Sequence, residues 1–262
     1  METFARFGYA AKGFVYAAIG ILALLAAFTT GGKTTGTSGA LQAIASQPFG
    51  KVLLGLIAFS LIGYVIWRLI EAFNDPDNKG TDAKGLLTRF GYALSALAYA
   101  GVAINAALLA IGSSSSSSGG GSSSKQDWTA TVMQQPFGRW LVGIGGAIIV
   151  GIGFYRIYRA YKVKFRKKLN LSELNIKQEK WLVNISRFGI AARGVVFIMI
   201  GFFVLQAAKN YNPQNVKGLD GALLTLAQQP YGKVLLALMA LGLIAYAIYL
   251  FLQARYRRFK IN

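Results

Sequence analysis

Basic side chains that recur at matching places in three copies of one pattern are the residues best suited to chemistry in this chain. The first set stands at the start of apolar runs: Arg6, Arg89 and Arg187. The second lies six residues later and has a cation in two copies: Lys12 and Arg193. The third follows a Gln-Pro-aromatic-Gly motif: Lys51, Arg139 and Lys233. Rings of positive charge could attract an anion or anionic lipid headgroups, and near a helix end Lys12 could extend its ammonium to those headgroups.

Other chemistry has little support in the sequence. The chain contains no Cys and no His, which excludes thiol catalysis, disulfides, haem ligation through these residues and the usual zinc sites. No phosphate-binding loop or serine nucleophile motif is found, and the carboxylates lie mostly in loops. Arg68 and Glu71 have the spacing of an exposed helical ion pair, worth less than about 1 kcal/mol. We therefore expect a protein that is not an enzyme and that carries no metal or cofactor.

Six long apolar runs must position these cations. Hydrophobic residues make up 54% of the chain and charged residues 14%, and the mean hydropathy is +0.45. The runs cover approximately residues 7–29, 50–72, 90–112, 137–160, 188–208 and 231–254. Each is long enough to cross a bilayer and lacks the polar face of a soluble helix. The sequence predicts an all-α integral membrane protein with six transmembrane helices.

The distribution of charge predicts the orientation of these helices. The net charge of +19 would also fit a nucleic-acid-binding protein, but 21 of the 28 Lys and Arg residues fall on one side of the predicted topology. That side holds both termini, the loop at 73–89 and the loop at 161–187. The positive-inside rule places it in the cytoplasm. We expect the lipid bilayer as partner, with anionic lipids on the cytoplasmic side, and no nucleic acid.

The chain is one membrane domain, 1–262, built from three repeats at about 6–73, 89–161 and 187–256. Each repeat has two apolar runs joined by a short helix that we place at the outer membrane surface, ending before Pro48, Pro136 or Pro230. The Ser/Gly-rich segment 113–124 is predicted to be a flexible outer loop, and 161–187 a basic cytoplasmic linker. Each repeat begins and ends on the same side, which predicts parallel repeats in a pseudo-threefold bundle.

Small residues recur at equivalent places in the apolar runs, seven or eight residues apart on one helix face. In the first runs they are Gly13, Gly20, Ala96, Ala103, Gly194 and Gly201. In the second runs they are Gly55, Gly63, Gly143, Gly151, Ala237 and Ala245. Helices in a bilayer associate through close packing of such residues, so we expect these faces to be helix–helix contacts.

These motifs resemble a bacterial membrane family catalogued as domain of unknown function 1206. The resemblance rests on Arg-Phe-Gly-Tyr-Ala-Ala-Lys-Gly at 6–13, Gly-Ala-Leu-Gln at 39–42 and Gln-Pro-Phe-Gly-Lys at 47–51, with their counterparts in the other copies. The second copy departs from it, with Ser95 in place of a cation and a Ser/Gly insertion. The family implies a six-helix protein of the bacterial inner membrane and no catalytic residues.

Three functions stay open at this level. The first is a non-enzymatic structural or interaction module, alone or with a membrane-protein partner. The second is a channel or transporter for a small solute or anion, drawn from the rings of basic residues. The third is binding of lipid or a hydrophobic cofactor near the equivalent aromatic residues Tyr16, Tyr99 and Phe197.

Overall fold

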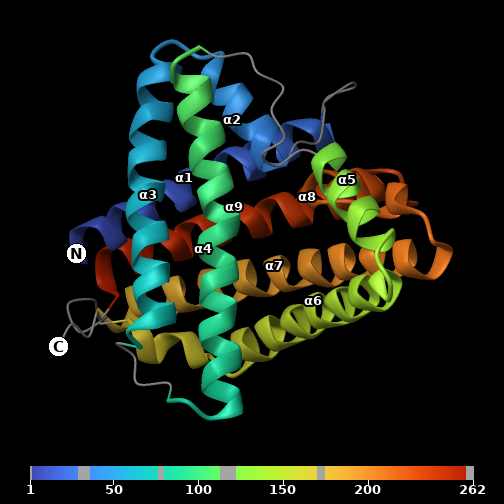
Figure 1. Ribbon diagram of the computed structural model, residues 1–262. Helices are drawn as coiled ribbons and strands as arrows, with labels where there is room; N and C mark the ends of the chain where they lie inside the picture. Colours follow the sequence, from blue (N-terminus) through green and yellow to red (C-terminus); the bar gives the residue numbers. More distant parts are fainter. Residues whose placement is uncertain (1, 29–35, 76–79, 113–121, 170–174, 258–262) are drawn as a thin grey trace.

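The computed structural model describes residues 2–28, 36–75, 80–112, 122–169 and 175–257, and these residues form helices joined by short connections (Figure 1). The long helices are α1 (Glu2–Phe28), α3 (Gly50–Phe73), α4 (Ala83–Ala110), α6 (Gly138–Tyr161), α7 (Ile176–Asn210) and α9 (Gly232–Tyr256). The short ones are α2 (Thr37–Ala45), α5 (Ser122–Met133) and α8 (Leu219–Ala227), with 3-10 turns η1 (Lys164–Lys168) and η2 (Pro213–Asn215). All six long helices are long and apolar enough to cross a membrane. The predicted fold class of six spanning helices is confirmed.

The two ends of the bundle differ. The start of α1, the end of α9 and the turn from α6 to α7 lie toward the left in Figure 1, whereas α2, α5 and α8 lie toward the top and right. We call these the inner end and the outer end. Each repeat thus runs from the inner end to the outer end and back. The segment predicted as a flexible loop, 113–124, lies mostly outside the described residues, and α5 begins within it at Ser122.

The helices pack most extensively across the boundaries between repeats. The closest pairs are α3 with α4, α6 with α7, and α9 with α1, so the last long helix of each repeat lies against the first of the next. Pairs within a repeat, α1 with α3 and α7 with α9, form the next most extensive contacts. The chain therefore closes on itself through α9 and α1. The single threefold axis that the repeats predict stays a prediction.

Glycines bring α6 and α7 into backbone contact. A Cβ added to Gly146 would lie 3.2 Å from the carbonyl oxygen of Gly201, and one added to Gly194 would lie 2.9 Å from that of Gly153. Between α1 and α9, a Cβ on Gly20 would lie 3.0 Å from the carbonyl oxygen of Ala240. Without an aqueous hydrophobic drive between helices, such close approach is a main source of association in a bilayer.

The small residues singled out in the sequence fall into two groups. In the first long helices, Gly13, Gly20, Gly194 and Gly201 lie in these contacts, and Ala96 and Ala103 of α4 are buried. Of those in the second long helices, Gly63 and Ala245 are buried, Ala237 is half-buried, and Gly143 has only Ala208 nearby, 3.8 Å from an added Cβ. Gly55 and Gly151 have nothing within 4 Å of an added Cβ. The reason on α6 is that the helix turns Gly146 and Gly153 toward α7 instead.

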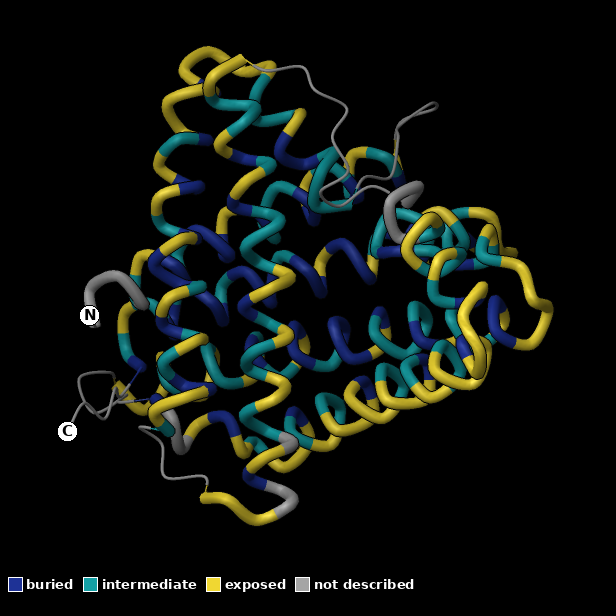
Figure 2. The backbone as a smooth tube through the Cα atoms, in the orientation of Figure 1, coloured by how far each residue is buried: buried dark blue, intermediate teal, exposed yellow. Residues whose placement is uncertain are grey.

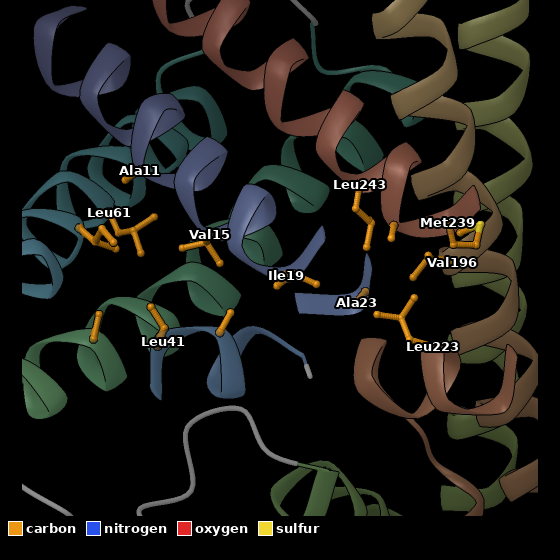
Figure 3. Packing of buried hydrophobic residues seen from close by; sticks show 14 of the residues in the cluster. Ala11, Val15, Ile19, Ala23, Leu41, Leu61, Val196, Leu223, Met239 and Leu243 are labelled. Carbon is orange, nitrogen blue, oxygen red and sulfur yellow. The ribbon is translucent and has the colours of Figure 1, made fainter. Parts of the chain in front are cut away.

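An apolar core fills the centre of the bundle. The core includes three residues of α1, Val15, Ile19 and Ala23, together with Leu61 of α3 and Leu243 of α9 (Figure 3). Leu41 and Leu223 close it from the short helices α2 and α8. Exposed residues follow the outer faces of α3, α4 and α6 (Figure 2). In a spanning protein those apolar faces meet lipid.

The Gln-Pro-aromatic-Gly motif forms the turn between each short helix and the next long one. Its aromatic residue has left-handed backbone geometry, with φ near 60° at Phe49, Phe137 and Tyr231. The glycine that follows has no space for a side chain, because a Cβ on Gly138 would lie 1.8 Å from the carbonyl oxygen of Val132. The same overlap occurs at the other two turns, at 2.0 and 2.1 Å. The motif recurs because only glycine fits the turn.

We expect Gly138→Ala to lower the free energy of unfolding by about 3 kcal/mol, since the turn must open to admit the methyl group. Gly151→Ala on the same helix is the matched control; nothing lies within 4 Å of its Cβ, so the change should stay within about 1 kcal/mol of wild type. Thermal unfolding in detergent, followed by circular dichroism, measures both. Equal stability of the two variants would contradict the packing constraint.

Candidate functional site

All six long helices line a cavity of about 140 Å³ at the inner end. Six of its lining residues are cations: Lys12, Arg68, Arg156, Arg159, Arg193 and Arg257. Six are tyrosines: Tyr9, Tyr64, Tyr92, Tyr99, Tyr246 and Tyr249. The remainder are Ser95, Ile190 and Gln253. We call this the inner cavity.

The inner cavity is assembled from equivalent positions of the three repeats. One set, from the first long helices, is Lys12, Ser95 and Arg193; another is Tyr9, Tyr92 and Ile190. In the second long helices Arg68 and Arg156 are equivalent, as are Arg159 and Gln253. The cavity thus forms where the three repeats converge, and their differences in sequence make its lining asymmetric.

Lys12 points into this cavity from α1. Its side chain is buried, and its ammonium donates a hydrogen bond to the Tyr64 hydroxyl at 2.9 Å. The ammonium also lies 4.3 Å from the ring centroid of Tyr64 and 4.1 Å from that of Tyr99, where the ring faces attract a cation. The expectation that Lys12 reaches the headgroups is therefore wrong. Hydroxyl and ring partners on α3 and α4 hold it inside the bundle.

Two arginines retain unused donors in the same space. Arg193 is buried, donates to the Tyr246 hydroxyl, and lies over the rings of Tyr246 and Tyr16 at 4.5 and 4.7 Å. Arg156 lies over the ring of Phe197 at 4.7 Å. In the described part of the chain, the buried Nε of each arginine has no hydrogen-bond partner. A buried donor without a partner costs about 1–3 kcal/mol, so these groups suit an acceptor brought by a ligand.

Glu71 is the acidic group at the edge of the inner cavity. One carboxylate oxygen accepts from Arg68 at 2.7 Å, and the other accepts from Arg257 at 2.6 Å. Glu71 is 1% exposed, so the expectation of an exposed helical pair is wrong: Arg257, at the far end of the chain, covers it. The other four lining cations have no carboxylate within ion-pair distance among the described residues. Among the described residues, six lining cations therefore lie beside one carboxylate, which leaves positive charge in excess.

The predicted rings of basic residues lie elsewhere, at the ends of neighbouring helices. Arg6 donates to the carbonyls of Ala254 and Arg255 at the end of α9, and Arg89 to those of Ala72 and Phe73 at the end of α3. At the outer end, Arg139 donates in the same way to Ala208 and Lys209 of α7. These cations satisfy carbonyls that a helix leaves unpaired and oppose the negative end of its dipole.

The remaining members of the rings are placed less tightly. The Lys51 ammonium lies 3.2 Å from where a Cβ of Gly112 would stand, just beyond the end of α4. Arg187 is half-buried and Lys233 is exposed. Of the eight basic residues singled out in the sequence, Lys12 and Arg193 are the two that line the inner cavity. Whether any of the eight binds lipid or a ligand stays a prediction.

The sequence analysis did not select four cations of the inner cavity as site residues: Arg68, Arg156, Arg159 and Arg257. Each lies near the inner end of a span, where mixed aromatic and basic residues usually mark the membrane surface. One signal could have revealed them. Arg68 and Arg156 occupy equivalent positions in two repeats, and Tyr64, Arg68 and Glu71 share one helix face with the buried side of α3.

The lining is suited to an acceptor-rich ligand. Ammonium and guanidinium groups only donate hydrogen bonds, and tyrosine hydroxyls both donate and accept. A metal cation would meet repulsion from the excess positive charge and would find few anionic ligands. The geometry therefore favours a small anion or an anionic group of a larger molecule.

We expect Glu71→Gln to lower the free energy of unfolding by about 3–5 kcal/mol, because Arg68 and Arg257 would lose their buried counter-charge. Glu179→Gln is the control: its partner Arg166 is largely exposed, so the loss should stay below about 1 kcal/mol. Thermal unfolding of both variants in the same detergent tests this. A Glu71→Gln variant as stable as Glu179→Gln would contradict the buried network.

Comparison with known proteins reproduces the repeat pattern. The family model Domain of Unknown Function (DUF1206) matches residues 7–75, 90–163 and 188–257, which confirms three tandem repeats. A relative from Bacillus subtilis (strain 168), described as Uncharacterized protein YxxB, is 37% identical over 257 residues. The alignment covers 98% of this chain and 91% of the relative. No solved structure matches the chain.

Proposed function

This chain belongs to the family Domain of Unknown Function (DUF1206), and we propose that it is a membrane protein whose inner cavity binds an anionic group. One observation carries the proposal: six cations line a cavity within a six-span bundle, and Glu71 is the one carboxylate that pairs with them in the described part of the chain. Charges within a membrane bundle are costly unless they are paired or solvated. An anion in the cavity would supply the missing counter-charge.

The donors favour an oxyanion. Guanidinium groups match the planar or tetrahedral oxygens of carboxylate, sulfate and phosphate, and charge-assisted hydrogen bonds are about twice as strong as neutral ones. Lys12, Arg156 and Arg193 come from three helices and converge on one space of about 140 Å³. That space suits a single oxyanion or the head of a larger molecule.

We further propose that the inner end faces the cytoplasm of a bacterium and that the protein lies in the inner membrane. The support is the charge asymmetry, with 21 of the 28 Lys and Arg residues on the side of the two termini. We assign the cavity a role in binding and not in catalysis, because its cations can donate hydrogen bonds to a ligand held in one place. A partner in a larger membrane complex stays a prediction.

We expect inorganic phosphate to raise the melting temperature of the purified protein in non-ionic detergent, relative to chloride at equal ionic strength. A ligand at 100 times its dissociation constant stabilises by about 2.7 kcal/mol, or at least about 5 °C for a chain of this size. Arg156→Gln should lose this shift, because one of the unpaired donors is gone. Without phosphate, Arg156→Gln should melt no lower than wild type, since removing one positive charge relieves repulsion among the cations of the cavity.

Lys233→Gln provides the control for this experiment. It removes the same charge from an exposed position at the outer end and should keep the full phosphate shift. If phosphate and chloride give equal melting temperatures in wild type, or if Lys233→Gln and Arg156→Gln lose the shift alike, anion binding in the inner cavity is refuted.

We expect a green fluorescent protein fused after Asn262 to fluoresce in intact cells, because the C-terminus is assigned to the cytoplasm. An alkaline phosphatase fused at the same position should be inactive. The same pair of fusions in the outer segment 113–121 serves as the control and should give the opposite result. An active phosphatase at the C-terminus would reverse the proposed orientation.

A further inference from the structure

All three repeats line the inner cavity, but their two long helices pack together beside it only in repeats 1 and 3 among the described residues. Gly8 of α1 is buried against α3, where an added Cβ would lie 2.3 Å from the Cβ of Tyr64. Gly189 of α7 is buried in the same way against Tyr246 of α9, 2.3 Å from its backbone nitrogen. The equivalent Gly91 of α4 is exposed, and no described residue lies within 4 Å of an added Cβ. The contact that closes two repeats is missing from the third.

Other equivalent positions agree. Tyr64 is 0% exposed and Tyr246 is 4% exposed, whereas Ile152, their counterpart on α6, is 40% exposed. Ser95 is half-buried where Lys12 and Arg193 are buried. Extensive contacts join α1 to α3 and α7 to α9, and no comparable contact joins α4 to α6 in the described part of the chain. We take the side of the cavity between α4 and α6, which these contacts do not close, as its opening.

This opening faces the apolar part of the membrane. Only 17% of the apolar window of α4 and of α6 is buried, against 39% to 56% for the other spans. Leu94 of α4 is 51% exposed and Ile152 of α6 is 40% exposed. In a spanning protein such side chains contact acyl chains. Tyr92, Ser95, Arg156 and Arg159 line the cavity from these two helices, so a molecule in the bilayer would meet them first.

A second, mostly apolar cavity adjoins the first at Arg193. It has a volume of about 360 Å³ and lies toward the outer end, where α1, α2, α6, α7 and α9 line it together with residues 216–219, which include the cation Lys217. Its lining includes Tyr16, Val196, Phe197 and Leu243, while Arg193 lines both cavities. A cationic space and an apolar space thus meet at one guanidinium.

We infer that the ligand of the inner cavity is an anionic phospholipid of the surrounding leaflet, which enters sideways between α4 and α6. Its phosphate head occupies the cationic space, and an acyl chain follows the apolar cavity beyond Arg193. The inference rests on the proposed anion binding and adds the source of the anion. A water-soluble phosphate would pair with the cations, but it would neither fill the apolar cavity nor account for the opening toward lipid.

Because the chain has no Cys, a single introduced thiol can report occupation of the opening. We use Ser95→Cys on α4 and Ile152→Cys on α6 as reporters from opposite walls, so that one remains if the other fails to fold. Leu97→Cys and Phe154→Cys, which face away on the same helices, are matched controls. The measurement is the rate of maleimide labelling of the full-length protein in non-ionic detergent, with added phosphatidylglycerol, phosphatidylcholine, glycerol 1-phosphate or inorganic phosphate.

Phosphatidylglycerol at ten times its dissociation constant should slow labelling at positions 95 and 152 by about tenfold and leave positions 97 and 154 unchanged. Phosphatidylcholine and both soluble phosphates should protect much less at equal concentration. Equal protection by a soluble phosphate would overturn the phospholipid inference and leave anion binding intact. Equal slowing at the control positions would indicate coating by lipid and would also overturn it. If no compound protects, the inference fails, and the phosphate melting experiment decides the proposed function separately.

Discussion

Close backbone approach of α6 to α7 and of α9 to α1 is the interaction on which this structure depends. In a bilayer, apolar helix faces are already surrounded by lipid, so the hydrophobic effect does not drive them together. Close packing through small residues must hold them together instead. Gly146 and Gly153 of α6 meet Gly201 and Gly194 of α7 at the distance of backbone contact. The same type of contact joins α9 to α1 and brings the two ends of the chain together. The inner cavity lies where these helix pairs meet.

The cost of burying charge decides how the inner end is built. Aromatic rings and hydroxyls hold the cations that have no carboxylate: Tyr64 and Tyr99 hold Lys12, and Tyr16 and Tyr246 hold Arg193. Glu71 joins Arg68 to Arg257 and so fastens the end of the chain to α3. Ring faces and hydroxyls stabilise a cation without neutralising it. The site therefore keeps its positive potential, which is what an anion requires.

Sequence differences between the three repeats make the inner cavity asymmetric. Repeats 1 and 3 place a cation, a tyrosine and a close-packed glycine at the positions where repeat 2 has Ser95, Ile152 and an exposed Gly91. Three identical repeats would seal the space on every side. The departures in repeat 2 remove bulk and contact on one side only, toward the lipid-facing helices α4 and α6. Within the described residues, α4 and α6 are thus the one pair of long helices of a repeat that lacks extensive contact.

The sequence alone determined six spans, three parallel repeats, the short outer helices and the more basic side, because apolar length, repeated motifs and charge placement are local properties of the chain. It did not determine which cations face inward. Arg6 and Lys12 lie six residues apart on one helix; the first caps α9, and the second enters the inner cavity. In the sequence, a cation whose side chain extends to the headgroups occupies the same kind of position near a helix end as one whose side chain points into the bundle. Only the neighbouring helices, supplied by packing across repeat boundaries, distinguish the two.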